Sequence, residues 1–167
     1  MSPTTRQICF INAAHFFTHY GLLVLATAVL ALTQQDAARF GGEYGPILAL
    51  GTAMFVVYGL GALPMGHLAA RWGRKALMVA FFLGAGASMA LAGLAQGPVT
   101  LALGLAGFGA FAAIYHPIGT AIIAEAGGDR VGRAIGINGV FGNLGVASAP
   151  VVTALLFAGR AGTSLTA

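Results

Sequence analysis

Residues 76–95 read ALMVAFFLGAGASMALAGLA, a run of 20 residues without a charged side chain. At 1.5 Å of rise per residue, a helix of this length is about 30 Å long, which matches the hydrocarbon core of a bilayer. The apolar residues do not alternate with polar ones, as they do in the strands of a membrane barrel. The run therefore predicts a transmembrane helix.

Similar apolar runs lie on both sides of this segment. They cover residues of about 8–32, 44–69, 98–124 and 134–158, and short loops separate them. Short loops favour antiparallel packing of each helix on the next one. We therefore predict an all-α membrane protein with about five transmembrane helices, which form a single domain over residues 1–167.

The composition of the whole chain favours a lipid environment. Of its 167 residues 58% are hydrophobic and only 7% are charged, whereas soluble domains carry about 25% charged residues. The single cysteine, Cys9, excludes an internal disulfide. We recognise no paired-carboxylate site, nucleophile elbow, phosphate loop or basic patch with interleaved aromatic residues. We therefore expect a protein that is not an enzyme, needs no cofactor and has no nucleic-acid partner.

Basic residues near the ends of the runs predict the orientation. By the positive-inside rule, the side that is richer in Lys and Arg faces the cytoplasm. Six basic residues fall on the side of the N terminus and two on the other: Arg6, Arg71, Arg74, Lys75, Arg130 and Arg133 against Arg39 and Arg160. We predict a multi-pass protein of the cell (inner or plasma) membrane with a cytoplasmic N terminus.

Histidines are the titratable side chains that we expect at depth in the membrane, because all four acidic residues fall in loops. His15 and His19 are four residues apart, which places them on one helix face, and Asn12 extends this stripe. His15 lies about 10 Å, and His116 about 12 Å, from the cytoplasmic end of its run. The two runs are therefore expected to carry their histidines at similar depth.

Three interpretations of these polar residues stay open. Imidazoles titrate near neutral pH, so His15, His19 and His116 can carry a proton or bind an anionic substrate. Each histidine can instead bond to a neighbouring helix and only fix the packing. Two histidines at this spacing also fit one face of a metal ion, but without an acidic or cysteine ligand beside them in the runs we expect no metal. Asn138 and Asn143 either line the same pathway or cross-link helices.

Proline and glycine are expected to bend the helices or to loosen their packing. Pro117 directly follows His116, removes a backbone donor and predicts a kink. Glycine recurs at every third position from Gly136 to Gly145, and Pro150 follows in the same run. Small residues let membrane helices approach closely, so we expect a close or moving helix interface there.

Residues 66–75, in and before the loop after the second run, read GHLAARWGRK. This segment resembles the signature loop of the major facilitator superfamily. That signature reads Gly, three residues, Asp, a basic residue, any residue, Gly, Arg and a basic residue. The matching positions are Gly66, Arg71, Gly73, Arg74 and Lys75. Ala70 stands where the family usually has the Asp that latches one conformation. The resemblance implies a cytoplasmic gating loop that lacks the usual latch.

The last run resembles the antiporter signature of the same superfamily. Gly136, Gly145 and Pro150 match it, with Ala149 in place of the usual Gly. In the fourth run, Leu103 stands where proton-linked exporters of the superfamily often carry an arginine. Proton coupling would therefore need other groups, and the histidines are the candidates.

Two further segments look most like the fosmidomycin-resistance-like branch of the superfamily. They are residues 15–19, HFFTH, and residues 115–117, YHP, and residues 138–150 add to the likeness. That branch typically has an acid where His19 stands. The resemblance implies a secondary transporter that exports small drug-like or anionic molecules by alternating access, with the first and fourth runs lining a central cavity.

Only part of such a fold fits into 167 residues. The implied fold has two halves of six helices each, and the small, polar tail after residue 158 stops where a sixth helix is expected. We therefore expect a truncated N-terminal half that works with the missing C-terminal half or a second chain. The alternative is a membrane module that does not transport and assembles with a partner chain through its glycine-rich helix faces.

Overall fold

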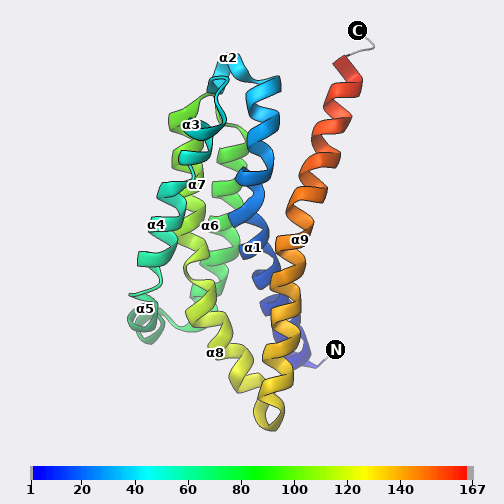
Figure 1. Cartoon of the computed structure of the whole chain (residues 1–167). Helices are drawn as coiled ribbons and strands as arrows, with labels where there is room; N and C mark the ends of the chain where they lie inside the picture. The colour runs from blue at the N-terminus through cyan, green and yellow to red at the C-terminus, as the bar shows by residue number, and fades with distance from the viewer. Residues whose placement is uncertain (1, 165–167) are drawn as a thin grey trace.

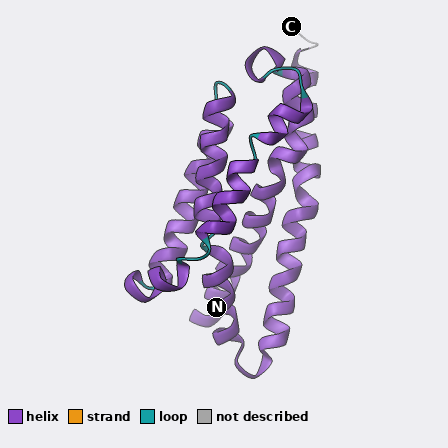
Figure 2. Ribbon diagram, turned by 60° about the vertical axis from the view of Figure 1, so that its left-hand side comes forward, coloured by secondary structure: helices purple, strands orange, loops and turns teal. Residues whose placement is uncertain are grey.

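The chain forms helices and the turns between them, and the described residues contain no strand (Figure 2). The structure is a computed structural model that describes residues 2–164. Its helices are α1 (Pro3–Gln35), α2 (Ala37–Phe40), α3 (Tyr44–Ala49), α4 (Thr52–Gly61), α5 (Met65–Trp72), α6 (Arg74–Gly93), α7 (Pro98–Ala112), α8 (Tyr115–Gly127), the 3-10 helix η1 (Gly128–Arg130) and α9 (Val131–Ser164). The predicted all-α class is confirmed.

Four helical segments of the described chain are long and apolar enough to cross a membrane. They are Thr4–Gln35, Tyr44–Gly61, Arg74–Gly93 and Pro98–Ala158. The last of them has 61 residues and folds back on itself at the turn between α8 and α9 (Figure 1). This segment therefore covers both of the last two runs predicted from the sequence.

Two of the runs that we predicted as single helices are interrupted. Residues 44–69 divide into α3, α4 and α5, with breaks at Gly51 and just before Met65. Pro64 contributes to the second break, because it has no N–H to bond to a carbonyl of the preceding turn. Residues 98–124 divide into α7 and α8 at Ala113, whose carbonyl has lost the N–H that Pro117 cannot supply.

The most extensive helix contact joins α1 and α9, which are distant in sequence and side by side in space (Figure 1). A Cβ atom added to Gly145 of α9 would overlap the backbone carbonyl of Phe16 in α1. Backbones that approach this closely need small residues at the interface. The expectation that each run packs on the next holds for α6 with α7 and for α8 with α9, but α4 packs mainly on α7.

Apolar side chains also cover the outside of the bundle. Leu63, Leu83 and Leu103 are 80%, 71% and 68% exposed. Tyr115 and Phe81, in contrast, are the largest of the fully buried side chains. Apolar surface of this kind has no cost in lipid, where the helices satisfy their own backbone hydrogen bonds.

The two ends of the bundle carry different charge. The start of α1, the turn between α5 and α6 and the turn between α8 and α9 lie at one end (Figure 1). These segments hold the six basic residues that the sequence assigns to one side. Arg39 belongs to α2 at the opposite end, and the side chain of Arg160 lies outside the described residues. Basic residues are therefore concentrated at the end that holds the N terminus.

Candidate functional site

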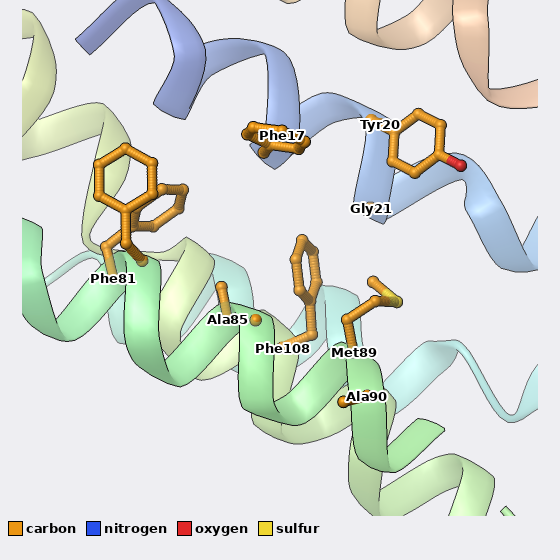
Figure 3. Close-up of a pocket in the computed structure, with 10 residues that line it drawn as sticks. Phe17, Tyr20, Gly21, Phe81, Ala85, Met89, Ala90 and Phe108 are labelled. Carbon is orange, nitrogen blue, oxygen red and sulfur yellow. The ribbon is translucent and has the colours of Figure 1, made fainter. Parts of the chain in front are cut away.

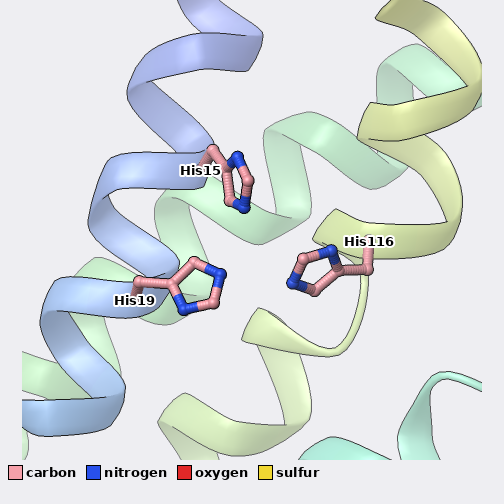
Figure 4. Close-up of side chains that lie close together, drawn as sticks. All are labelled: His15, His19 and His116. Atoms are coloured by element: carbon pink, nitrogen blue, oxygen red, sulfur yellow. The ribbon is translucent and has the colours of Figure 1, made fainter. Parts of the chain in front are cut away.

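Three histidines meet between α1 and α8 (Figure 4). His15 and His19 come from α1 and His116 comes from the start of α8, and all three are partly buried. The centroid of the His15 ring lies 4.8 Å from the centroid of the His19 ring and 5.3 Å from that of the His116 ring. The ring centroids of His19 and His116 lie 5.5 Å apart. One nitrogen of each ring lies within 4.8 Å of the others. The structure therefore brings together the histidines that the sequence placed at similar depth.

The ring of His15 is held in one orientation by α9. Its Nδ1 lies 2.7 Å from the backbone carbonyl oxygen of Asn138. A carbonyl oxygen can only accept, so Nδ1 carries a proton, and in the neutral ring Nε2 keeps its lone pair. Gly142 leaves room for this ring, because a Cβ atom at that position would lie 2.6 Å from Nε2. The packing of α9 thus selects both the position and the tautomer of His15.

Two asparagines form a buried polar network beside the histidines. The Tyr115 hydroxyl donates to Oδ1 of Asn138 over 2.8 Å, and Nδ2 of Asn138 donates to Oδ1 of Asn12 over 2.9 Å. Asn12 is 5% exposed and Asn138 is 3% exposed. No buried side-chain nitrogen or oxygen of the described residues lacks a hydrogen-bond partner. The network therefore cross-links α1, α8 and α9 without leaving an unpaired buried group.

Tyrosines form the walls of the histidine cluster. Tyr115 stacks on His15 with a centroid distance of 4.8 Å, and Tyr58 of α4 meets His116 edge-on at 6.2 Å. Neither tyrosine was among the predicted site residues. Tyr115 directly precedes His116 and the helix-breaking Pro117, which is the one sequence signal that points to it. Tyr58 has no such signal, because its position depends on the packing of α4 against α7.

The cluster combines free imidazole nitrogens with an absence of fixed charge. Among the described residues, none donates to or accepts from the ring nitrogens of His19 and His116, and no Asp, Glu, Lys or Arg belongs to the cluster. These nitrogens are available to three kinds of ligand: a proton, an anion that accepts a hydrogen bond from a protonated ring, or a metal ion that accepts the nitrogen lone pairs.

Apart from the histidine cluster, the structure has a pocket of about 490 Å³ between α1, α6 and α7, which we call the hollow (Figure 3). Its walls are apolar, and the large side chains in them are Phe17, Tyr20, Phe81, Phe82, Met89 and Phe108. None of the predicted site residues lines it. Two residues along a helix turn by about 200°, so Phe17 and His15 project from opposite faces of α1. The hollow and the histidine cluster are therefore separate sites.

A comparison with known families identifies the fold to which these helices belong. The family model described as Major Facilitator Superfamily matches residues 8–166. The chain belongs to the major facilitator superfamily. No curated protein and no solved structure matches the chain significantly. Membership indicates a multi-pass membrane transporter of a small molecule rather than an enzyme.

The segment that resembles the signature loop of the superfamily covers most of α5, the turn at Gly73 and the start of α6. Gly73 has a φ of 82°, a left-handed conformation that glycine adopts without steric cost. Arg74 follows it and pairs with Glu125 of α8 over 2.6 Å. The other matching positions, Gly66, Arg71 and Lys75, are exposed. The ion pair was not predicted, because nothing in the sequence places the end of α8 beside this turn.

Three predicted residues of α9 lie away from the cluster. Asn143 is exposed, unlike Asn138, and no hydrogen bond joins it to another described residue. Gly136 is exposed with no atom within 4 Å of an added Cβ, and Pro150 lies inside the helix with its ring exposed. Gly145 packs against α1. Of the predicted site residues in α9, only Asn138 forms hydrogen bonds to the residues of the cluster.

Proposed function

We propose that this chain is the N-terminal part of a secondary transporter that exports small drug-like or anionic molecules by alternating access. Among the branches of the superfamily, the segments at His15–His19 and Tyr115–Pro117 favour the fosmidomycin-resistance-like one. The observation that carries the proposal is the cluster of His15, His19 and His116, whose free nitrogens are partly buried between two membrane helices. Titratable groups at such depth mark substrate or proton pathways in membrane proteins.

In this proposal the histidines take up one proton at a time. Two charged imidazoles with centres about 5 Å apart repel by about 3 kcal/mol at an effective dielectric constant of 20. One proton shared among three rings avoids this repulsion. The single positive charge then attracts an anionic substrate, or a proton leaves as a neutral substrate enters. Asn12 and Asn138 keep the rings in place, and Asn143 belongs to the pathway on a face of α9 that another part of the transporter covers.

We place the N terminus in the cytoplasm of a cell (inner or plasma) membrane. The concentration of basic residues at the end that holds the N terminus supports this orientation by the positive-inside rule. The segment that contains Gly66, Arg71, Gly73 and Lys75 then faces the cytoplasm as a gate. Arg74 and Glu125 take the part of the latch that Ala70 cannot supply.

The residues of the antiporter signature are proposed to let α9 move. Pro150 removes one backbone hydrogen bond inside α9. Gly136 has open space beside it and Gly145 has none. The helix is therefore free to change its neighbours near Gly136 while it stays fixed to α1 near Gly145.

Transport by the product of the native gene tests the proposal. The protein is reconstituted in vesicles with a pH gradient, and the flux of a panel of fluorescent drugs and small organic anions is measured. We expect flux that depends on the gradient, and loss of that dependence in His116→Ala and His15→Ala. His67→Ala is the matched control, because His67 is exposed on α5. Flux with unchanged pH dependence in both cluster variants would remove the histidines from the mechanism.

A second candidate function is a membrane module that does not transport. Gly136 and Gly139 of α9 have no atom within 4 Å of an added Cβ, so this face is open to another helix. A partner chain that packs there would use the close approach that small residues allow. A native product that copurifies with a second chain and shows no flux for any member of the panel would favour this function over transport.

A further inference from the structure

We propose that His15, His19 and His116 bind one divalent transition-metal ion such as Zn²⁺. The sequence argued against a metal, because it offered two histidines on one helix and no acidic or cysteine ligand near them. The structure adds a third imidazole from α8 within 4.8 Å of the other two. Three histidines are a complete set of protein ligands for a zinc ion that keeps one open position.

The distances require only a small adjustment. Nitrogens bound to a tetrahedral ion at 2.0–2.1 Å lie about 3.3 Å from one another. From separations of up to 4.8 Å, each nitrogen has to move inward by about 1 Å. Histidine χ2 is broad and shallow, and the rings of His19 and His116 have no hydrogen bond to a described residue that would resist this turn.

His15 already has the arrangement of a metal ligand. In metal sites, the histidine nitrogen that does not bind the ion almost always donates to a carbonyl or carboxylate oxygen. Nδ1 of His15 donates in this way to the carbonyl of Asn138, which leaves Nε2 unprotonated for the ion. This hydrogen bond is independent of the clustering, because it joins His15 to α9, whereas the cluster is formed by side chains of α1 and α8.

The ligand types decide the class of metal. Imidazole nitrogen suits Zn²⁺, Ni²⁺, Cu²⁺ and Fe²⁺, whereas Mg²⁺ and Ca²⁺ require oxygen ligands. Neutral imidazoles leave the charge of the ion uncompensated, so the fourth position suits hydroxide or a small anion. The tyrosine nearest to His15 donates its hydroxyl to Asn138 and is not a ligand.

Titration of the purified full chain in detergent with Zn²⁺ tests the proposal, with a purification tag that contains no histidine. Isothermal calorimetry is expected to give one Zn²⁺ per chain with a Kd at or below about 10 µM. His15→Ala, His19→Ala and His116→Gln are each expected to weaken binding more than tenfold. His67→Ala is expected to bind as the wild type does. Loss of the site in His67→Ala, or its full retention in His116→Gln, would overturn the proposal.

Cobalt provides a measurement that needs no substitution. Four-coordinate Co²⁺ has intense visible absorption, so the unaltered chain is expected to turn strongly coloured at one equivalent and to bleach when Zn²⁺ is added. Weak, six-coordinate absorption would refute the proposed four-coordinate site of three histidines and one open position, even if the variants fail to fold. Binding does not depend on transport. Vesicles without flux would contradict the proposed function alone, and a chain without Zn²⁺ binding would contradict this inference alone.

Discussion

Replacing Gly145 by alanine is expected to weaken the contact between α1 and α9, and Gly139 on the same helix supplies the control. A Cβ atom at Gly145 would overlap the carbonyl oxygen of Phe16 and lie 3.1 Å from the amide nitrogen of Tyr20. Both are backbone atoms, which cannot rotate away, so the two helices have to separate. A Cβ atom at Gly139 meets nothing within 4 Å.

The size of the effect follows from two opposing terms. Alanine favours helix over glycine by about 1 kcal/mol at either position. Forcing an extra carbon into a packed interface costs about 1–3 kcal/mol, and this cost applies at Gly145 only. The propensity term cancels between the two variants. Gly145→Ala is therefore expected to have a free energy of unfolding about 1–3 kcal/mol lower than Gly139→Ala.

Reversible unfolding in detergent mixtures measures this difference. Both variants and the wild type are titrated with SDS, and the helical circular dichroism signal gives the free energy of unfolding. Gly139→Ala is expected to match or slightly exceed the wild type. Equal free energies for the two alanine variants would refute the close approach of α1 and α9 at Gly145.

Three further predictions concern the polar residues. Asn138→Leu is expected to lower the free energy of unfolding by about 1–3 kcal/mol, because it leaves two buried polar groups unpaired; Asn143→Leu, at an exposed position, should leave the SDS midpoint unchanged. Arg74→Ala is expected to cost less than about 1 kcal/mol in the same titration, because both partners of its ion pair with Glu125 are partly exposed. Zn²⁺ affinity is expected to fall as the pH is lowered, because protonated imidazoles do not bind metal; calorimetry at two pH values checks this.

The helical class and the membrane environment follow from the sequence, because an uncharged run such as residues 76–95 has few other solutions. The breaks in the second and fourth runs could not be placed in the same way. Glycine and proline are tolerated inside membrane helices where neighbouring groups compensate for the lost hydrogen bond. Whether the helix is interrupted at Gly51 or Ala113 therefore depends on the residues that surround it in space. Hydropathy describes only the sequence and does not identify these neighbours.

Part of the histidine cluster could also be predicted. The spacing of four residues puts His15 and His19 on one face of α1, and matched depth brings His116 to the same level. Depth does not say which helices are adjacent. The anchor of His15 is a backbone carbonyl of α9, and a carbonyl is present at every residue, so no pattern of side chains identifies it. The same limit applies to Tyr58 of α4.

The three histidines and the anchor of His15 all belong to one helical bundle, and this limits how a ligand at the cluster can drive transport. A ligand shifts a conformational equilibrium only by the difference in its affinity for the two states. α1, α8 and α9 pack directly on one another, so a rocking motion of the whole bundle against a second half leaves the cluster unchanged. A proton or metal ion held by these side chains alone binds both states equally well. Coupling to transport therefore requires either a contact from outside the bundle or the proposed movement of α9 near Gly136, which would shift the Asn138 carbonyl that anchors His15. Binding of Zn²⁺ requires neither.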